Sequence, residues 1–260
     1  MKRMILLCGL VLLCAKGMAQ ISPVPSGVYH WADAKITKSA DRESRKFLQG
    51  STAELAFFEI HATTQQKGAA PKPAHTQTDI EELIFIKEGK AKITVGNQTQ
   101  TLGKGSLVLI PPLQSQSIAN VGDGPLTYYA LEFRSKQPMN LDRSAKAGGT
   151  AILNADSLVY KPSTLGGGIK YMQRPSAMFD YLELHITELK AKGPSHTPHT
   201  HVDTELTLVL EGNTEMIIGD KKYQGTAGDI YLMNSNELHG ISNAADAPCK
   251  YLAIRWRNNQ

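Results

Sequence analysis

The chain contains an internal duplication, and this constrains its fold more than any other feature. Seven residues between Gly89 and Ala130 recur 123 positions later, and five between Gln49 and His75 recur 124 positions later. A chance match would not hold its register over more than eighty residues, so the chain carries two copies of one fold. The recurring pairs are Gly89/Gly212, Gly96/Gly219, Gly105/Gly228, Asn120/Asn243, Pro125/Pro248, Tyr128/Tyr251, Ala130/Ala253, Gln49/Gln173, Ala53/Ala177, Glu59/Glu183, His61/His185 and His75/His199.

Each copy is predicted to be all-β. Short apolar runs, at 82–86, 106–110, 206–210 and 229–233, are separated by Gly-Asn, Gly-Asp and Gly-Lys turn signals. Closely spaced short strands are typical of a sandwich or a barrel. The run 206–210 is largely apolar on both faces, so we expect its own core on one side and the sister domain or a second subunit on the other. A second subunit would make the protein a homodimer, and a thicker core within one domain is the remaining alternative.

Residues 1–19 have the pattern of a signal peptide. Lys2 and Arg3 precede an apolar stretch over 4–15, and the small residues Gly17 and Ala19 flank a cleavage point before Gln20. The stretch is shorter than the about twenty apolar residues of a membrane-spanning helix, so we expect no membrane span and export to the periplasm or the exterior. The rest is predicted to form an N-terminal domain over 20–134, a polar linker over 135–150 and a C-terminal domain over 151–260.

The net charge and the cysteine content argue against nucleic acid as a partner and against an internal disulfide bond. The net charge is +4, but without the three basic residues of the signal segment 25 basic side chains face 24 acidic ones. A nearly neutral protein has no global field that attracts nucleic acid. Cys8 and Cys14 lie in the signal segment, so Cys249 is the single cysteine of the mature chain and no intramolecular disulfide is expected.

One cluster of residues in the second copy suggests metal chemistry. His199 and His201 alternate with Thr200, so in a strand they would point the same way, and Glu205 can share their face. His239, at the end of another strand, can approach from across the barrel. Three imidazoles and a carboxylate suit a divalent first-row metal and leave two octahedral positions open. Nitrogen-rich ligation argues against calcium and magnesium.

The same residues resemble the paired signature of the cupin superfamily. The spacing G-x5-H-x-H-x3-E-x6-G begins at Gly193, and a second motif runs from Gly228 through His239 to Asn243. The resemblance implies a two-cupin protein in which each half is a small β-barrel or jelly roll. It also implies that His199, His201, Glu205 and His239 bind one divalent transition metal, namely Fe, Mn, Ni, Cu or Zn. Asn234 and Asn236 replace the usual Pro and Gly, which is a departure in a turn and not at a ligand.

The corresponding site of the first copy is degenerate. It offers His75, Gln77, Glu82 and Gln116, which are one imidazole, one carboxylate and two neutral amides. Amide oxygens are poor partners for borderline metals, so we expect a structural half with a polar pocket.

Further candidates for catalysis accompany the metal ligands. Glu205 itself, His196 in a Gly-Pro-Ser loop at the mouth and Arg255 near the end of the last strand are the candidates for substrate contact. The repeated pairs Glu59/His61 and Glu183/His185 alternate with apolar residues that we expect to point inward, which would leave these pairs pointing outward.

The favoured function is that of an exported metal-dependent enzyme. Two adjacent open positions suit a small substrate that chelates through neighbouring oxygens, either carbohydrate-derived or catechol-like, and a dioxygenase is the leading reaction. Cupins also include isomerases and decarboxylases. The ureidoglycine aminohydrolases share the two-cupin layout but order their ligands differently, and a non-catalytic module that binds a sugar or small acid is an alternative of another class.

Export is expected to remove residues 1–19. Mass spectrometry of the protein recovered from the periplasm or the medium should give a chain that begins at Gln20, because the small residues before it suit signal peptidase. An intact Met1, or a lipid on Cys14, would contradict this expectation.

Overall fold

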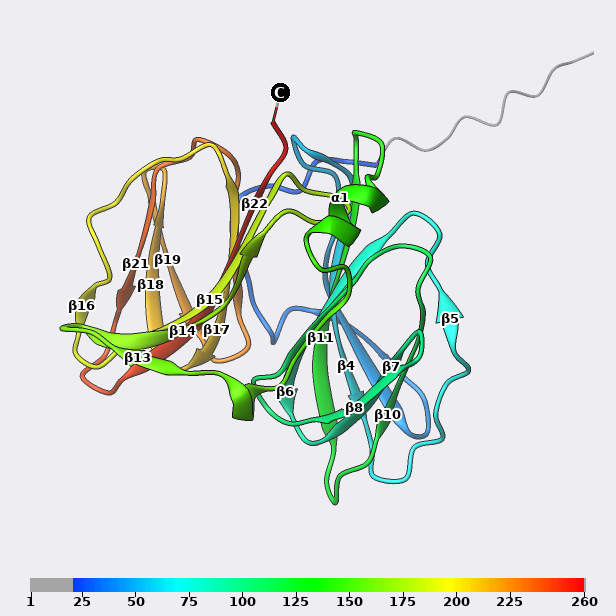
Figure 1. Cartoon of the computed structure of the whole chain (residues 1–260). Helices are drawn as coiled ribbons and strands as arrows, with labels where there is room; N and C mark the ends of the chain where they lie inside the picture. Colours follow the sequence, from blue (N-terminus) through cyan, green and yellow to red (C-terminus); the bar gives the residue numbers. More distant parts are fainter. Residues whose placement is uncertain (1–20, 260) are drawn as a thin grey trace, which may run out of the picture.

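The computed structural model describes residues 21–259, so the predicted signal peptide lies outside the described residues. Two β domains lie side by side (Figure 1). Each consists of a seven-stranded sheet and a four-stranded sheet, which confirms the predicted all-β pair of domains. The strands of the N-terminal domain, in sheet order, are β12 (Ala151–Leu153), β9 (Leu107–Ile110), β6 (Glu81–Glu88), β11 (Leu126–Ser135), β4 (Leu55–Gln65), β3 (Arg42–Gly50) and β2 (Lys35–Lys38), with β5 (His75–Thr76), β10 (Ser115–Asn120), β7 (Ala91–Val95) and β8 (Gln98–Leu102) in the smaller sheet.

The C-terminal domain repeats this arrangement. Its larger sheet consists of β1 (Gly27–Tyr29), β20 (Ile230–Met233), β17 (Thr204–Glu211), β22 (Cys249–Arg257), β15 (Tyr181–Leu189), β14 (Gly166–Arg174) and β13 (Tyr160–Pro162), and its smaller sheet of β16 (Gly193–Pro194), β21 (His239–Asn243), β18 (Asn213–Ile218) and β19 (Lys221–Thr226). In the part of the chain that the structure describes, helical structure is limited to α1 (Leu141–Lys146) and the 3-10 turn η1 (Ala155–Ser157). Within residues 21–259 no helix has the length and apolar character needed to cross a membrane.

One close backbone contact explains why the pairs Gly89/Gly212 and Pro125/Pro248 recur. Gly89 and Gly212 have φ of 85° and 77°, in the left-handed region that favours glycine. A Cβ atom at Gly89 would lie 2.4 Å from the carbonyl oxygen of Pro125, and one at Gly212 would lie 2.5 Å from that of Pro248. The Gly and Pro pairs therefore recur together because the same tight approach of two loops occurs in both domains.

The seven-stranded sheets are buried on both faces. One face of each sheet lines its own barrel, where it forms a separate apolar cluster. The other faces of the two sheets pack against each other in the largest cluster, which includes Phe58 and Phe133 from one domain and Leu206 and Trp256 from the other. This confirms that the sister domain covers the outward face of the run 206–210.

The prediction of which side chains of β4 and β15 point into the barrels is wrong, because the apolar side chains point outward and the polar ones inward. Phe58 and Ile60 of β4, like Leu184 of β15, belong to the cluster between the domains. The residues between them therefore face the barrel interiors, and His61 and His185 line pockets there. Apolar alternation identifies a buried face, but where both faces are buried it does not reveal which of the two faces is the barrel.

The two domains exchange their leading strands. β1 pairs with β20 of the C-terminal domain, and β12 pairs with β9 of the N-terminal domain, both antiparallel. Gly27 and Ala151, which begin these strands, are 124 positions apart, so the exchange follows the duplication. Each seven-stranded sheet is thus completed by a strand from the other half of the sequence.

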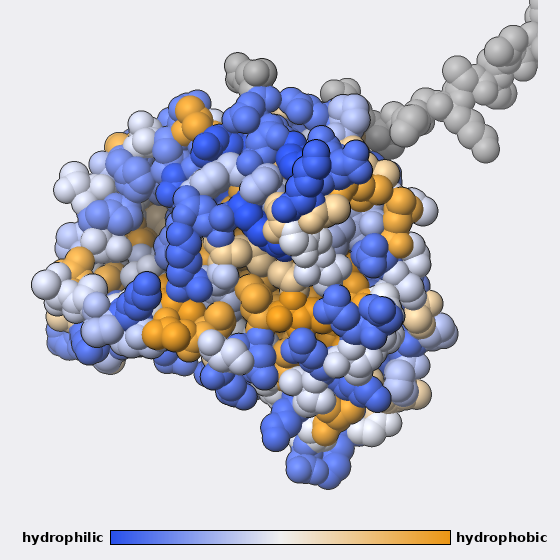
Figure 2. Space-filling view, viewed as in Figure 1, coloured by the Kyte–Doolittle hydropathy of each residue, from blue (hydrophilic) through white to orange (hydrophobic). Residues whose placement is uncertain are grey.

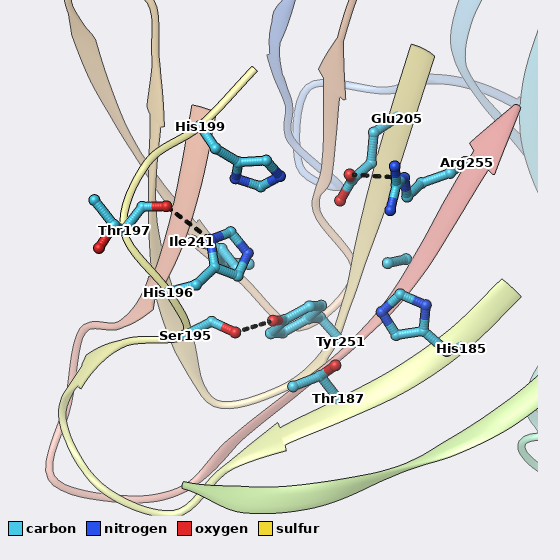
Figure 3. A pocket seen from close by; sticks show the side chains of 11 residues that line it. His185, Thr187, Ser195, His196, Thr197, His199, Glu205, Ile241, Tyr251 and Arg255 are labelled. Carbon is cyan, nitrogen blue, oxygen red and sulfur yellow. Dashed lines mark hydrogen bonds and ion pairs between the residues drawn. The ribbon is translucent and has the colours of Figure 1, made fainter. Parts of the chain in front are cut away.

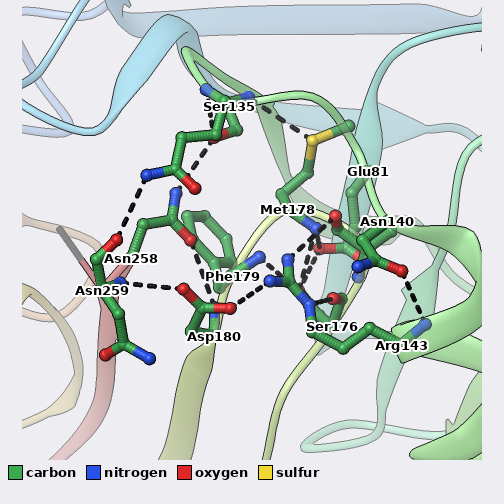
Figure 4. A network of polar contacts seen from close by, with 12 residues as sticks. Glu81, Ser135, Asn140, Arg143, Ser176, Met178, Phe179, Asp180, Asn258 and Asn259 are labelled. Carbon is green, nitrogen blue, oxygen red and sulfur yellow. Dashed lines mark hydrogen bonds and ion pairs between the residues drawn. The ribbon is translucent and has the colours of Figure 1, made fainter.

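A buried polar network also joins the domains at the end where α1 lies (Figure 4). Glu81, at the start of β6, is fully buried and accepts hydrogen bonds from the Ser176 hydroxyl at 2.6 Å and from the Ala177 and Met178 amides at 3.0 and 3.3 Å. Arg143 of α1 donates to the Ser176 carbonyl at 2.8 Å and pairs with Asp180. The linker helix is therefore anchored to the loop that precedes β15.

Apolar side chains also gather on the surface where the domains meet, between hydrophilic regions on either side (Figure 2). A hollow of about 370 Å³ there is lined by aromatic and aliphatic residues of both domains, including Phe85, Tyr171 and Ile186. The apolar interface thus extends from the core to the surface.

Phe133→Ala should destabilise the whole protein by about 3–5 kcal/mol, as is typical of a truncated buried aromatic residue. Its ring lies 5.5 Å from Phe58 and 5.7 Å from Trp256, so the cavity would open at the centre of the interface. Urea denaturation of the purified protein measures the change in unfolding free energy. Val159→Ala, at a residue that is 71% exposed, is the matched control and should change it by less than about 0.5 kcal/mol. Equal effects of the two variants would contradict a shared core.

Candidate metal centre

The four candidate ligands of the second copy come from three different elements. Glu205 lies on β17 in the middle of the large sheet, and His239 is the first residue of β21 in the small sheet. His199 and His201 lie in the loop that leads into β17, which corrects the expectation that they share a strand with Glu205. His199 instead forms an isolated bridge with His239, with reciprocal backbone hydrogen bonds of 2.9 Å.

The three imidazoles converge on one point. The ligand atoms of His199, His201 and His239 all lie within 4.8 Å of one another. The Glu205 carboxylate completes the group, since its Oε2 lies 3.1 Å from His201 Nε2 and 3.5 Å from His239 Nε2. This spacing of donor atoms is compatible with a single ion bound between them.

Backbone contacts orient two of the imidazoles. His201 Nδ1 lies 3.0 Å from the carbonyl oxygen of Asp203, and His239 Nδ1 lies 2.8 Å from that of Glu237. A carbonyl can only accept, so each Nδ1 carries a proton, and each Nε2 faces the Glu205 carboxylate. His239 Nε2 is buried and has no hydrogen-bond partner among the described residues, as expected of an atom that awaits a metal.

The loop that carries His201 is held by the turn before His239. The Asn236 amide donates to the His201 carbonyl at 2.8 Å, and Asn236 has a φ of 62°. Asparagine tolerates this left-handed conformation better than most residues, which explains why it can replace the usual glycine here.

The electrostatics favour an ionised carboxylate among the imidazoles. Burial alone would raise the pKa of Glu205, but the neighbouring imidazoles of His201 and His239 lower it well below its ordinary value. Burial and the neighbouring histidines lower the pKa of His199, so this imidazole favours the neutral form that binds metals. For His239 burial acts to lower the pKa, but Glu205 outweighs it and the net shift is upward.

A pocket of about 490 Å³ opens beside these ligands (Figure 3). His196 and His199 enter it from the loop, and Glu205, Arg255 and His185 enter it from the large sheet. The structure therefore brings the three predicted catalytic candidates, Glu205, His196 and Arg255, to one cavity. His196 is exposed at the mouth, where its ring centre lies 4.6 Å from that of His199.

Arg255 is held by a buried acid. Its terminal nitrogen pairs with Asp203 at 2.5 Å, and Asp203 also binds Arg257 at 2.6 Å. Burial would lower the pKa of Arg255, but Asp203 raises it, so the guanidinium remains charged. Its Nε is buried, lies 3.9 Å from Glu205 Oε2 and has no hydrogen-bond partner among the described residues.

Sequence reasoning missed part of the pocket wall. His185 was placed outward, although it lines the cavity and burial lowers its pKa. Tyr251 also lines the cavity, where it hydrogen-bonds to Ser195 at 3.1 Å. A signal was present, because His185 and Tyr251 both belong to the repeated pairs. Asp203 had no such signal, since its role depends on the pairing of strands that are distant in sequence.

The degenerate site of the first copy forms a smaller pocket of about 160 Å³. His75, Glu82 and Gln116 line it, but Gln77 is not among its lining residues. Gln116 Nε2 donates to Glu82 Oε2 at 2.6 Å, so an amide and a carboxylate bond to each other where the second copy gathers imidazoles around Glu205.

The chain is thus a two-domain β-barrel protein. Its second domain carries a cluster of histidines that is a candidate metal site. The chain belongs to the cupin family, because the cupin domain model matches it twice, at residues 61–132 and 185–255. This confirms the resemblance noted in the sequence. No curated protein sequence matches the chain significantly.

Solved structures with the same two-domain fold are distant in sequence. The oxalate decarboxylase of Lactobacillus farciminis, in complex with formate, has 13% identity and a TM-score of 0.70, with 92% of this chain and 88% of that chain covered. Protein YlbA from E. coli has 16% identity and a TM-score of 0.68, with 90% and 91% covered. AerE from Microcystis aeruginosa has 13% identity and a TM-score of 0.65, with 89% and 99% covered. At these identities the similarity shows the fold alone.

The purified protein should contain about one transition-metal ion per chain, and His239→Ala should lower metal affinity by at least about tenfold. The variant loses one of four ligands, whereas Gln116→Ala removes only a hydrogen bond in the other barrel. Elemental analysis beside melting curves measures both effects. Two metal equivalents in folded wild-type protein, or metal loss in Gln116→Ala, would contradict the assignment of the site to the second copy.

Proposed function

We propose that the protein is an exported metal-dependent enzyme that acts on a small metabolite through neighbouring oxygen atoms, and that the reaction is a dioxygenation. The observation that carries this proposal is the convergence of three imidazoles and Glu205 beside a cavity that also contains Arg255. His199, His201, Glu205 and His239 would hold the ion. A divalent transition metal supplies Lewis acidity to a chelating oxygen and, when it is iron, redox chemistry with dioxygen.

The remaining pocket residues fit a substrate with at least one anionic oxygen. The buried Nε–H of Arg255 lies beside Glu205 and has no hydrogen-bond partner within residues 21–259, and Asp203 holds the guanidinium in place. Such a preorganised donor would orient a carboxylate or an enolate oxygen. His185, with its lowered pKa, favours the neutral imidazole near pH 7 and can accept a proton from a substrate hydroxyl.

The pocket size suits a small molecule of the kind proposed. A volume of about 490 Å³ lies within the range of small-ligand sites, which is roughly 300–1,000 Å³. Carbohydrate-derived hydroxy-ketones and catechol-like diols both carry the neighbouring oxygens that an ion with two adjacent open positions can chelate.

Decarboxylation of a small acid is the second candidate. Arg255 suits a carboxylate substrate equally well, and the fold is shared with the oxalate decarboxylases of Lactobacillus farciminis and Bacillus subtilis, the second of which has Mn(II) centres. A dioxygenase and a decarboxylase can be told apart by oxygen consumption, because only a dioxygenase consumes oxygen.

Reconstitution with iron(II) should give oxygen uptake with a catechol, a 2-oxo acid or a hydroxy-ketone. Arg255→Gln should raise the KM for an anionic substrate by about 10–100-fold, the effect of losing one hydrogen bond to a charged group, with metal content unchanged. Oxygen-electrode and mass-spectrometric assays on the wild type, Arg255→Gln and His239→Ala measure this.

The same assay distinguishes the rival functions. Release of carbon dioxide without oxygen uptake, with manganese bound, would replace the dioxygenase by a decarboxylase. Tight binding of a substrate analogue without turnover under any metal would replace both by a non-catalytic binding module.

A further inference from the structure

The two barrels differ in charge at one equivalent position. In the C-terminal domain Arg255 of β22 lies directly opposite Glu183 of β15 on one side and Glu205 of β17 on the other. Residues that are directly opposite in neighbouring strands share a face, so Arg255 stands between two glutamates in this row, with its Nε 3.9 Å from Glu205 Oε2. The charges of this row alternate and compensate one another.

The N-terminal domain has an acid in place of the arginine. Glu132 of β11 lies directly opposite Glu59 of β4 and Glu82 of β6, so three carboxylates occupy one row across the sheet. Like charges placed directly opposite each other are destabilising. Unlike the row in the C-terminal domain, this row contains no cation.

Two of these carboxylates form no ion pair with a lysine, arginine or histidine within residues 21–259. Glu59 has its own, since Lys46 Nζ lies 2.8 Å and His61 Nδ1 3.2 Å from its oxygens. Glu82 is only 8% exposed and receives one hydrogen bond, from the neutral amide of Gln116. Glu132 is half-buried and has neither a hydrogen bond nor an ion pair with any residue in the range 21–259. Burial and the charge of Glu82 raise the pKa of Glu132, although His61 and Lys46 act to lower it.

Both carboxylates face the cavity of about 160 Å³ in the first barrel. Ile84, Ile118 and Tyr128 provide apolar wall. The basic side chains that line the cavity are Lys72, which is exposed, and the imidazoles of His61 and His75. Within the described part of the chain, three imidazole or carboxylate ligand atoms come within 4.8 Å of one another only at His199, His201 and His239. The first barrel therefore lacks the tight donor set of a single ion but has room for a polyatomic cation.

We propose that the N-terminal barrel is a binding site for a small organic cation of the guanidinium class, seated between Glu82 and Glu132. The planar N–H fork of a guanidinium matches carboxylate oxygens. The second barrel already carries such a group, because Arg255 occupies the position equivalent to Glu132 and lies opposite Glu205. The apolar wall accommodates a short hydrocarbon substituent. The two barrels would then bind ligands of opposite charge on the same scaffold.

Calorimetric titration of the metal-loaded mature protein with methylguanidinium chloride tests the proposal, with methylurea as the neutral isostere. Methylguanidinium should bind at one site per chain and methylurea should not. Glu132→Gln removes one charged acceptor but keeps the shape, and should weaken binding by at least about tenfold. Glu215→Gln, the same type of substitution on β18 of the other domain, should leave the affinity for methylguanidinium unchanged.

Glu132→Arg is a second test of the same site. Glu132→Arg reproduces the row of the C-terminal domain, so it should bind no methylguanidinium and should melt at a higher temperature than Glu132→Gln. Equal binding by wild type and Glu132→Gln, no detectable binding by the wild type, or Glu132-dependent binding of Ca²⁺ or Mn²⁺ instead of methylguanidinium would each overturn it.

Discussion

The packing of the two seven-stranded sheets against each other is the constraint on which the rest of the structure depends. Each sheet buries its barrel face and its outer face, and the sister domain covers the outer face with apolar side chains. Phe58, Phe133 and Trp256 meet at this interface with ring centres 5.5–5.7 Å apart. The exchange of β1 and β12 and the network around Glu81 lie at the same junction and add backbone and polar contacts to it.

The candidate metal centre takes its geometry from this scaffold. Glu205 and Arg255 lie on neighbouring central strands of the large sheet, whereas His239 begins a strand of the small sheet. The distance between their side chains is therefore set by how closely the two sheets of the barrel pack. His199 and His201 come from a loop, but backbone hydrogen bonds to His239 and Asn236 tie that loop to the small sheet. A site that connects two sheets in this way holds its ligands on rigid elements.

Comparison of the two copies distinguishes residues that maintain the fold from residues that give each pocket its own chemistry. The residues that recur in both copies include those that shape turns and close contacts, such as Gly89 and Gly212. The positions that differ include two in the pockets, where Gln116 replaces His239 and Glu132 replaces Arg255. One scaffold thus carries a nitrogen-rich centre with a cation beside it in one barrel and an excess of carboxylates in the other. The proposed functions of the two halves follow from these replacements.

The sequence by itself determined the duplication, the all-β character of both copies and the set of four candidate ligands. These depend on short-range signals, namely turn glycines, apolar runs and the spacing of His199, His201 and Glu205. It did not determine which face of β4 and β15 lines a barrel, so His61 and His185 were predicted to point outward. It also did not reveal that Asp203 pairs with Arg255 or that Glu132 lies opposite Glu59 and Glu82. Both depend on which strands become neighbours and on which sheet covers which face, and only the tertiary structure decides these, because alternation along one strand carries no information about the strand beside it.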